Sequence, residues 1–174
     1  NGGGRYRAVA LVDDDITDAR LEELHHAGVR GVRYGFVFAK PDPATVCRMA
    51  DRIAALGWHM ALFLRGDDIV THADLLRDLP VPLLFDHMAG IDPAKGGTDQ
   101  PAAHELVRHL KGGAGWAKLS ALENHSHQPY PFADATDLAR ALIDAAPDRV
   151  LWGTNWPHPD ALPDGPVNDG DLVD

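Results

Sequence analysis

Cysteine is almost absent from this sequence of 174 residues, in which Cys47 is the only example. A single thiol excludes an internal disulfide and any zinc site built from cysteines. We expect Cys47 to be a half-buried helix residue rather than a nucleophile. Long apolar runs are also missing, and no stretch of about 18 apolar residues predicts a transmembrane helix.

Positive charge is in short supply, because 16 Lys and Arg residues face 26 Asp and Glu residues and give a formal net charge of −10 at pH 7. This balance argues against nucleic acid and against an anionic membrane surface as partners. It does not exclude a small anionic substrate, since a few local arginines can outweigh the global charge. No signal peptide is visible, although the chain opens Asn1-Gly2-Gly3-Gly4 without Met, and we expect a reducing, cytoplasmic compartment.

Two nucleotide-binding motifs of α/β proteins are missing as well. No G-x-G-x-x-G follows the first predicted strand, and no P-loop is present. The rest of the composition is ordinary for a globular protein, with 45% apolar and 24% charged residues. The length is sufficient for one domain with a sizeable core, so we expect residues 1–174 to form a single domain.

Short apolar runs alternate with amphipathic segments along the chain. We expect six buried strands, at 7–12, 29–37, 60–64, 83–85, 116–119 and 150–152. Between them we expect helices, at 18–27, 43–56, 71–79 and 101–111, and a last one that Asp134 or Thr136 caps and Pro147 stops. Strict alternation predicts a parallel sheet with crossover helices, either open and doubly wound or part of a (β/α)8 barrel. A full barrel takes about 250 residues, so this chain is about two βα units short of one.

Residue types at the segment ends support these boundaries. Thr17 is placed as an N-cap, Gly28 as a helix stop, and Asp42 and Pro43 as the opening of the next helix. The segments 91–100 and 120–132 are polar and predict loops. Residues 159–174 are rich in Pro, Gly and Asp, and they predict an irregular C-terminal tail.

The stretch 149–158 is the most distinctive part of the sequence. The apolar run 150–152 predicts a strand buried on both faces, and Asn155, Trp156 and His158 follow it. A polar cluster beyond the carboxyl end of a buried parallel strand is where α/β folds place their chemistry. An ordinary strand end with a capping Asn is the alternative.

Four motifs, in order along the chain, carry a resemblance to a known family. They are Gly-Val-Arg-Gly-Val-Arg at 28–33, Asp-His-Met at 86–88, Trp-Ala-Lys-Leu-Ser at 116–120 and Trp-Gly-Thr-Asn-Trp-Pro-His at 152–158. Together they resemble the amidohydrolase superfamily, in the amidohydrolase-related (amidohydrolase 2) branch of 2-pyrone-4,6-dicarboxylate lactonase and related lactonases and decarboxylases. The resemblance covers nearly the whole chain. It implies a partial (β/α)8 TIM-type barrel of the metal-dependent-hydrolase kind, whose six strands correspond to strands three to eight.

The resemblance implies catalytic roles for His87 and Asn155. His87 would polarise a substrate carbonyl, or ligate a metal, at the barrel mouth, and a histidine hydrogen-bonded within a loop is the alternative. Asn155 stands where the family has the aspartate that activates water. A carboxamide cannot take up a proton at pH 7, so the chain would be inactive or strongly impaired unless another base, such as Asp160, serves instead.

Arginines at the fourth strand of the family barrel imply a grip on substrate carboxylates. Arg33, or its neighbour Arg30, has a guanidinium fork that suits this task. An ion pair of Arg33 with the aspartates at 13–15 is the alternative. The resemblance places four further side chains at substrate-binding positions, those of Phe63, Asn124, His125 and His158.

The family's anionic-substrate positions depart from its pattern here. Gly90 stands where the lactonases have Arg, Phe63 stands where they have Tyr, and the segment 120–125 lacks their Tyr-Arg pair. Two arginines and two phenol hydroxyls are therefore missing. We expect a substrate with less charge than a dicarboxylated pyrone.

Several other polar residues have open roles. His125 and His127 could chelate a metal from an extended segment, but on a proline-rich loop we expect a surface or pocket-rim position. Lys118 is either an inward polar group or a partner of Asp86. His25, with its neighbour in the same helix, is expected on the helix surface.

The expected function is a hydrolase that opens a lactone, or a related cyclic ester or amide, with an activated water. The alternatives are a metal-dependent decarboxylase of the same superfamily and a catalytically inactive chain that binds or assembles through its unpaired sheet edges. We expect no cofactor; the alternative is one divalent metal such as zinc or manganese. The expected partner is a small carbonyl or carboxylate substrate, with no nucleic acid and no membrane, and a homo-oligomer stays open.

Overall fold

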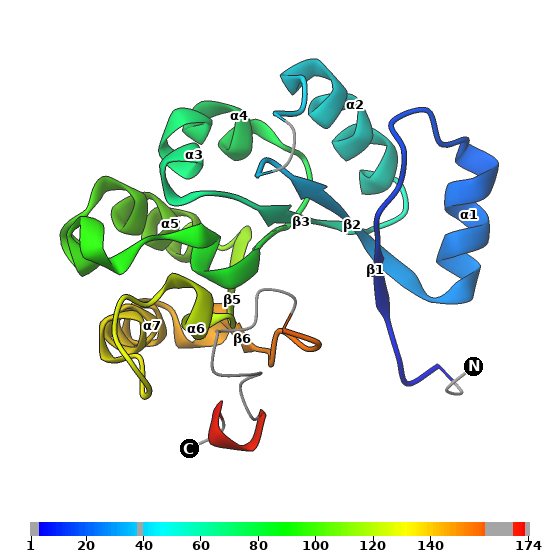
Figure 1. Cartoon of the computed structure of the whole chain (residues 1–174). Coiled ribbons are helices and arrows are strands. Elements are labelled where there is room, and N and C mark those ends of the chain that lie inside the picture. Colours follow the sequence, from blue (N-terminus) through cyan, green and yellow to red (C-terminus); the bar gives the residue numbers. More distant parts are fainter. Residues whose placement is uncertain (1–3, 38–39, 159–168, 173–174) are drawn as a thin grey trace.

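A parallel sheet organises the computed structural model, which describes residues 4–37, 40–158 and 169–172. Six strands lie in the order β1-β2-β3-β4-β5-β6, so each strand pairs with the next one in the sequence. The strands are β1 (Ala8–Ala10), β2 (Val29–Gly35), β3 (His59–Phe63), β4 (Leu83–Phe85), β5 (Gly115–Leu119) and β6 (Val150–Trp152). Figure 1 shows the sheet curling, with the helices along its outer side. This is the expected partial (β/α)8 barrel.

The helices provide the return path between parallel strands, which a tight turn cannot make. They are α1 (Asp18–Ala27), α2 (Pro43–Ala54), α3 (Gly66–Thr71), α4 (Ala73–Asp78), α5 (Pro101–Lys111), α6 (Leu122–His125) and α7 (Ala133–Ala145). Shorter 3-10 segments are η1 (Asp86–Gly90), η2 (Pro93–Lys95), η3 (Gly97–Asp99), η4 (Pro147–Arg149) and η5 (Asp169–Leu172).

The predicted ends of α1 and α2 are confirmed. The Thr17 side chain accepts a hydrogen bond from the backbone N–H of Arg20, and Gly28 ends α1 with a φ of 105° that favours glycine. Asp42 caps α2 in the same way through the N–H of Thr45. Local side-chain chemistry therefore determines where these helices begin and end.

The hydrophobic core lies between the sheet and its outer helices. Trp58, Met60 and Phe85 are fully buried there, as are Met49 and Ile53 on α2. Each such side chain contributes about 1.5–3 kcal/mol relative to an exposed position. Every residue of β4 and the three central residues of β3 are buried, so the polar residues beyond the carboxyl ends of these strands follow well-packed segments.

The two outermost strands are not buried as predicted. Val9 on β1 is 42% exposed, and on β6 Leu151 is 41% and Trp152 is 56% exposed. Each of these strands pairs with one neighbour only within the described sheet. The prediction of a buried strand was wrong for β1, and that of a strand buried on both faces was wrong for β6, because apolar composition does not reveal a strand's place at a sheet edge.

Three helical predictions also need correction. The helix predicted at 71–79 is the shorter α4, and a separate helix that was not predicted, α3, precedes it across His72. The loop predicted at 120–132 contains α6. Neither Asp134 nor Thr136 is the N-cap of α7, which starts after Phe132 in a left-handed conformation with a φ of 56°. The Asp134 carboxylate instead accepts hydrogen bonds from Ser126 and from backbone N–H groups.

Of the predicted irregular tail at 159–174, the structure describes residues 169–172. Residues 159–168 and 173–174, including the alternative base Asp160, lie outside the described residues. Within the tail, Asp169–Leu172 forms the short helix η5.

Candidate active site

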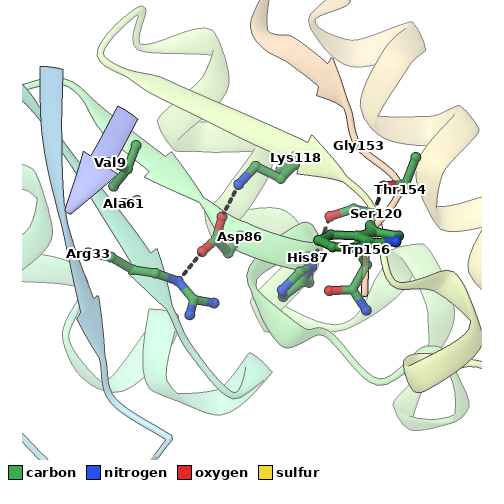
Figure 2. Close-up of a pocket in the computed structure, with 11 residues that line it drawn as sticks. Val9, Arg33, Ala61, Asp86, His87, Lys118, Ser120, Gly153, Thr154 and Trp156 are labelled. Carbon is green, nitrogen blue, oxygen red and sulfur yellow. Dashed lines mark hydrogen bonds and ion pairs between the residues drawn. The ribbon is translucent and has the colours of Figure 1, made fainter. Parts of the chain in front are cut away.

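A cavity of about 360 Å³ opens beyond the carboxyl ends of the strands. Residues from all six strands, or from the segments that follow them, line it (Figure 2). They are Val9, Arg33, Ala61, Asp86, His87, Lys118, Ser120, Gly153, Thr154, Asn155 and Trp156. Arg33, His87 and Asn155 therefore converge on one cavity, because parallel strands point their carboxyl ends to one rim.

Asp86 is the electrostatic centre of one wall. Its carboxylate, 2% exposed, accepts a hydrogen bond from Arg33 Nε at 2.6 Å and another from Lys118 Nζ at 2.5 Å. Burial by itself would raise the pKa of Asp86, but the charges and hydrogen bonds of Lys118 and Arg33 outweigh it and lower that pKa. Asp86 is thus a permanent anion that orients two cations, and a poor proton acceptor.

These contacts decide two alternatives that the sequence left open. Lys118 is a partner of Asp86. Arg33 pairs with Asp86 and not with the aspartates at 13–15, of which Asp14 accepts a hydrogen bond from the hydroxyl of Tyr34. The guanidinium of Arg33 also lies 4.7 Å from the ring centre of Phe63. The face of the Phe63 ring therefore packs against the guanidinium of Arg33.

His87 follows Asp86 at the start of η1. Its Nδ1 lies 2.8 Å from the hydroxyl oxygen of Ser120, and the edge of Phe63 packs against its ring. Burial lowers the pKa of His87 to about 4, so the imidazole is neutral at pH 7. Because the Nδ1–hydroxyl bond runs in either direction, Nε2 is a donor in one tautomer and an acceptor in the other.

The backbone that presents His87 is unusual. Residues 87, 88 and 89 have φ values of 53°, 52° and 58°, in the left-handed region that non-glycine residues rarely adopt. Gly90 continues the turn at 62°, and a Cβ there would lie 2.1 Å from the carbonyl oxygen of Leu64. The arginine that the family pattern has at this position does not fit the present backbone. Such strain is concentrated at functional sites in folded proteins.

Asn155 also lines the cavity, beyond the end of β6, and has a positive φ of 65°. Its side-chain Nδ2 donates to Glu123 Oε1 at 3.2 Å. The same carboxylate oxygen lies 3.1 Å from His158 Nδ1, and His158 Nε2 lies 2.9 Å from Asp169. The predicted substrate-binding residue His158 is therefore buried in a polar chain behind the cavity wall.

Charge on His158 is favoured by its two carboxylate neighbours. Burial alone would lower the pKa of His158, but the hydrogen bonds and charges of Glu123 and Asp169 outweigh it and raise that pKa. With both ring nitrogens protonated, His158 donates to a carboxylate on each side. The His158 side chain therefore links α6 with η5.

The remaining predicted substrate-binding residues lie at different distances from the cavity. The substrate-binding position predicted for Arg30 needs correction, because Arg30 does not line the cavity. Its guanidinium donates to the carbonyl oxygens of His25 and Val29 at the start of β2. Asn124 is exposed on α6. His125 is half-buried, with its ring centre 6.3 Å from that of His87, and burial lowers its pKa.

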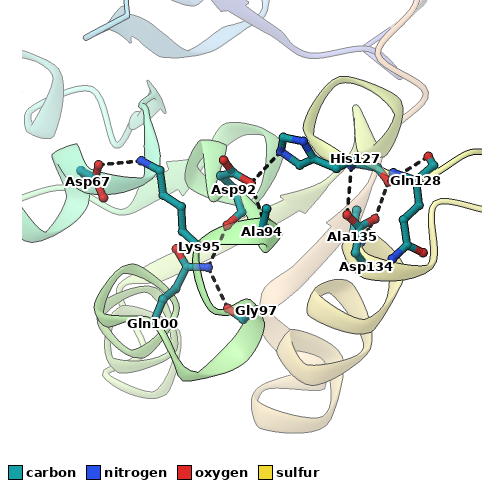
Figure 3. A network of polar contacts seen from close by, with 11 residues as sticks. Asp67, Asp92, Ala94, Lys95, Gly97, Gln100, His127, Gln128, Asp134 and Ala135 are labelled. Atoms are coloured by element: carbon teal, nitrogen blue, oxygen red, sulfur yellow. Dashed lines mark hydrogen bonds and ion pairs between the residues drawn. The ribbon is translucent and has the colours of Figure 1, made fainter.

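His125 and His127 have different neighbours, since the ring of His125 lies near His87 and that of His127 near Asp92. His127 Nε2 lies 2.9 Å from Asp92, and its backbone N–H donates to Asp134 (Figure 3). Asp92 also accepts from the N–H of Ala94, so this network ties the segment after η1 to the start of α7. The surface position predicted for His25 was wrong, since its Nδ1 accepts a hydrogen bond from buried Trp58 at 2.9 Å.

Sequence reasoning missed the importance of Ser120 and Glu123. Ser120 orients His87, and its position directly after a predicted strand was a usable signal. Glu123 had no such signal, because an acid in a predicted loop ordinarily points into water. In the structure it is 3% exposed and lies behind Asn155.

A divalent metal does not fit the donors on the cavity wall. Asp86 is the one carboxylate that lines the cavity among the described residues, and cations already bind both of its oxygens. An incoming metal would have to displace Arg33 and Lys118 against their charge. Within the described ranges, no group of three or more His, Cys, Asp or Glu side chains is arranged to hold a metal ion.

Known proteins identify the family of this fold and site. The sequence matches the family model of the amidohydrolases, "Amidohydrolase", over residues 1–173. The chain belongs to the amidohydrolase family. It is 37% identical to the 2-pyrone-4,6-dicarboxylate hydrolase of Comamonas testosteroni over 187 residues, an alignment that covers 100% of this chain and 60% of the relative.

A second relative and a solved structure agree with this assignment. The 4-sulfomuconolactone hydrolase of Hydrogenophaga intermedia is 34% identical over 175 residues, covering 98% of this amidohydrolase and 57% of the relative. A crystal structure of an Agrobacterium tumefaciens protein without ligand superposes with a TM-score of 0.87 at 27% identity, over 98% of this chain and 61% of that one. The amidohydrolase chain thus spans 60% and 57% of the length of the two relatives. Among its described residues, no helix has the length and apolar character needed to cross a membrane.

Proposed function

We propose that this amidohydrolase opens a lactone, or a related cyclic ester or amide, by attack of water on the carbonyl carbon. One observation carries the proposal: Arg33, His87 and Asn155, which follow or end three different strands, line one cavity. The two relatives are named as hydrolases of a pyrone and of a muconolactone, which supports a cyclic ester as the substrate class.

The charge balance of the wall favours a substrate with little negative charge. Arg33 and Lys118 surround Asp86, which leaves one net positive charge on this wall. Gly90 and Phe63 add neither a cation nor a hydroxyl group. A substrate with one carboxylate, held by the guanidinium of Arg33, is matched better than a dianion.

His87 is proposed to polarise the carbonyl. When the Ser120 hydroxyl donates to Nδ1, the proton of the neutral imidazole is on Nε2, which then donates to the carbonyl oxygen. Negative charge develops on that oxygen as water attacks, so the hydrogen bond strengthens in the transition state. The ring carbon–oxygen bond then breaks, and the ring oxygen leaves with a proton as a hydroxyl group.

Residue 155 limits the rate of this reaction. The Asn155 amide can accept a hydrogen bond from water, but it cannot take the proton. A positioned general base contributes about 100- to 10,000-fold, so we expect slow hydrolysis by the native chain. Asn155→Asp is expected to raise kcat/KM about 100-fold at mildly alkaline pH against a panel of lactones. Failure of every variant to open any lactone at any pH would overturn the proposal.

We propose that the reaction proceeds without a bound metal. The engagement of Asp86 by two cations supports this. Metal analysis of the purified protein and an assay after chelation test it. Loss of activity to a chelator, with release of carbon dioxide from a carboxylated substrate, would favour the metal-dependent decarboxylase instead.

The exposed sheet edges favour a second candidate, a chain that assembles with another copy. Val9 on β1 and Trp152 on β6 present apolar surface beside strands with one neighbour each in the described sheet. A dimer in light scattering at micromolar concentration is expected under this candidate. A monomer over the whole concentration range would contradict it.

A cytoplasmic compartment is part of the proposal. It is supported by the single cysteine, Cys47, which is half-buried and free. Fractionation of cells that express the protein would test it, and recovery outside the cytoplasm would contradict it.

A further inference from the structure

Glu123 is a buried carboxylate for which the proposed reaction has no direct use. It lies on the short helix α6, behind the cavity wall. Its Oε1 accepts the hydrogen bond from Asn155 Nδ2 at 3.2 Å and lies 3.1 Å from His158 Nδ1. Its Oε2 is buried and has no hydrogen-bond partner among the described residues. A carboxylate so placed needs donors, and it has them on one oxygen only.

The hydrogen-bonding capacity of residue 155 follows from this neighbour. An ionised carboxylate only accepts hydrogen bonds, so Glu123 requires the amide nitrogen of Asn155 to face it. The amide oxygen, Oδ1, is then the atom left for the cavity. An aspartate at 155 would put a second carboxylate at hydrogen-bond distance from the first. Two such groups cannot both ionise, and they share a proton.

We propose that Glu123 is a positioning residue for position 155, and that the two residues form a matched pair that accommodates one carboxylate. In this chain the carboxylate is Glu123 and the amide is Asn155. Exchanging the two functional groups would return the carboxylate to the cavity wall without creating a like-charge pair. The catalytic test of this pair rests on the proposed function. The pairing is also measurable without catalysis, through stability.

The surroundings of the pair offer no second compensation for an added carboxylate. His158 is already shared between Glu123 and Asp169. His125, which is close enough for Glu123 to raise its pKa, has that pKa lowered overall by burial. On the cavity side, Lys118 and Arg33 are engaged by Asp86, and His87 is neutral at pH 7.

The experiment compares four chains: the native protein, Asn155→Asp, Glu123→Gln and the double variant. The first readout is the denaturant midpoint as a function of pH. In Asn155→Asp the shared proton raises the pKa of the pair above its unfolded value. The stability associated with that proton is then present at low pH and lost as pH rises through the raised pKa. We expect the midpoint of Asn155→Asp to fall progressively below that of the native chain between about pH 5 and pH 8.

The double variant is expected to remove this pH dependence, because it contains one carboxylate again. Two matched controls separate the pairing from nonspecific effects. Glu105→Gln also replaces a buried glutamate, on α5, in contact with Arg108 and not with Asn155, and it should not rescue Asn155→Asp. Asn124→Asp adds a carboxylate on the exposed face of α6 and should show no comparable loss.

The second readout is the pH profile of kcat/KM with a lactone. We expect the rise of activity in Asn155→Asp to have an apparent pKa at least about one unit above that of the double variant. Equal pH dependence of the midpoints of Asn155→Asp and the double variant would overturn the pairing. So would a misfolded Asn155→Asp chain that Glu123→Gln fails to rescue. Coupled midpoints without any hydrolysis would overturn the proposed function and leave the pairing supported.

Discussion

Asp86 and Glu123 are two buried carboxylates near the same cavity, and their surroundings differ. Asp86 binds a cation through each of its oxygens, whereas Glu123 has its two hydrogen bonds with described residues on one oxygen. Asp86 lies on the cavity wall, and Glu123 lies behind it. A carboxylate whose oxygens are both paired stays ionised and holds its partners in place. A carboxylate with hydrogen bonds on one oxygen, such as Glu123, limits which residue types can lie next to it.

This difference also predicts opposite responses to pH. The pKa of Asp86 is lowered, so its contribution to stability is present above its ordinary value of 3.8 and is lost as pH falls through the folded value. The pKa of His158, the partner of Glu123, is raised. Its contribution is present below the ordinary value of 6.5 and is lost as pH rises through the folded value.

The largest effect is expected from removing Asp86, the carboxylate whose two oxygens are both paired with cations. Asp86→Ala leaves Arg33 and Lys118 side by side without a counter-charge. We expect a loss of about 3 kcal/mol in the free energy of unfolding, less than for a fully buried pair because both cations keep some contact with solvent. Urea denaturation measures it.

An exposed ion pair provides the control for this comparison. Asp74→Ala removes the partner of Arg77 on α4, where the carboxylate is surrounded by water. We expect no measurable change, since surface pairs contribute little. Equal losses for the two variants would contradict the special role of Asp86.

His87 lines the same cavity, and its removal is expected to have the next largest effect. His87→Gln is expected to lower kcat about 100-fold, because the oxyanion loses a preorganised donor. Ser120→Ala should lower kcat less, since it frees the ring without removing it. The pKa of His87 of about 4 means that this imidazole loses its neutral form only below about that pH. An acid limb of the His87-dependent rate near pH 6.5 would contradict this.

A smaller effect separates the two arginines of β2. Arg33→Ala is expected to raise KM about tenfold for a carboxylated lactone, which corresponds to one charge-assisted hydrogen bond. Arg30→Ala should leave KM unchanged, because its guanidinium is bound to backbone carbonyls at the start of the strand. Steady-state kinetics of both variants measure the difference, and a similar rise in both would place Arg30 in the site after all.

The smallest effect concerns His158, the histidine partner of Glu123. His158→Gln is expected to lower the denaturant midpoint more at pH 6 than at pH 9, since the native imidazolium is lost on the alkaline side. His104→Gln, on the exposed face of α5, is the matched control and should give a difference that does not vary with pH. A loss for His158→Gln that is larger at pH 9 would reverse the expected charge state of His158.

Much of the fold was predictable because its signals are local. The alternation of apolar runs predicted six parallel strands. Thr17 and Asp42 begin their helices and Gly28 ends α1, as expected. The start of α7 was not predictable in this way, because the carboxylate of Asp134 is engaged by residues of the preceding loop. The exposure of β1 and β6 escaped prediction for a related reason, since it depends on which strands have neighbours.

The candidate site was predictable in its members and not in its pairings. Strand ends pointed to Arg33, His87 and Asn155, and the cavity contains all three. The sequence left the partner of Arg33 undecided, placed His158 on the substrate and attached no importance to Glu123. Each of these depends on side chains that are more than 30 residues apart in the chain and adjacent in space.

The order of residues by itself determined the parallel topology, the main helix ends and the family, because periodicity, capping chemistry and short motifs act over a few residues. Only the tertiary structure decided which polar groups share a proton or a charge. Burial removes water from Asp86 and Glu123, and a carboxylate without water must take its hydrogen bonds from whatever side chains the curled sheet brings within reach.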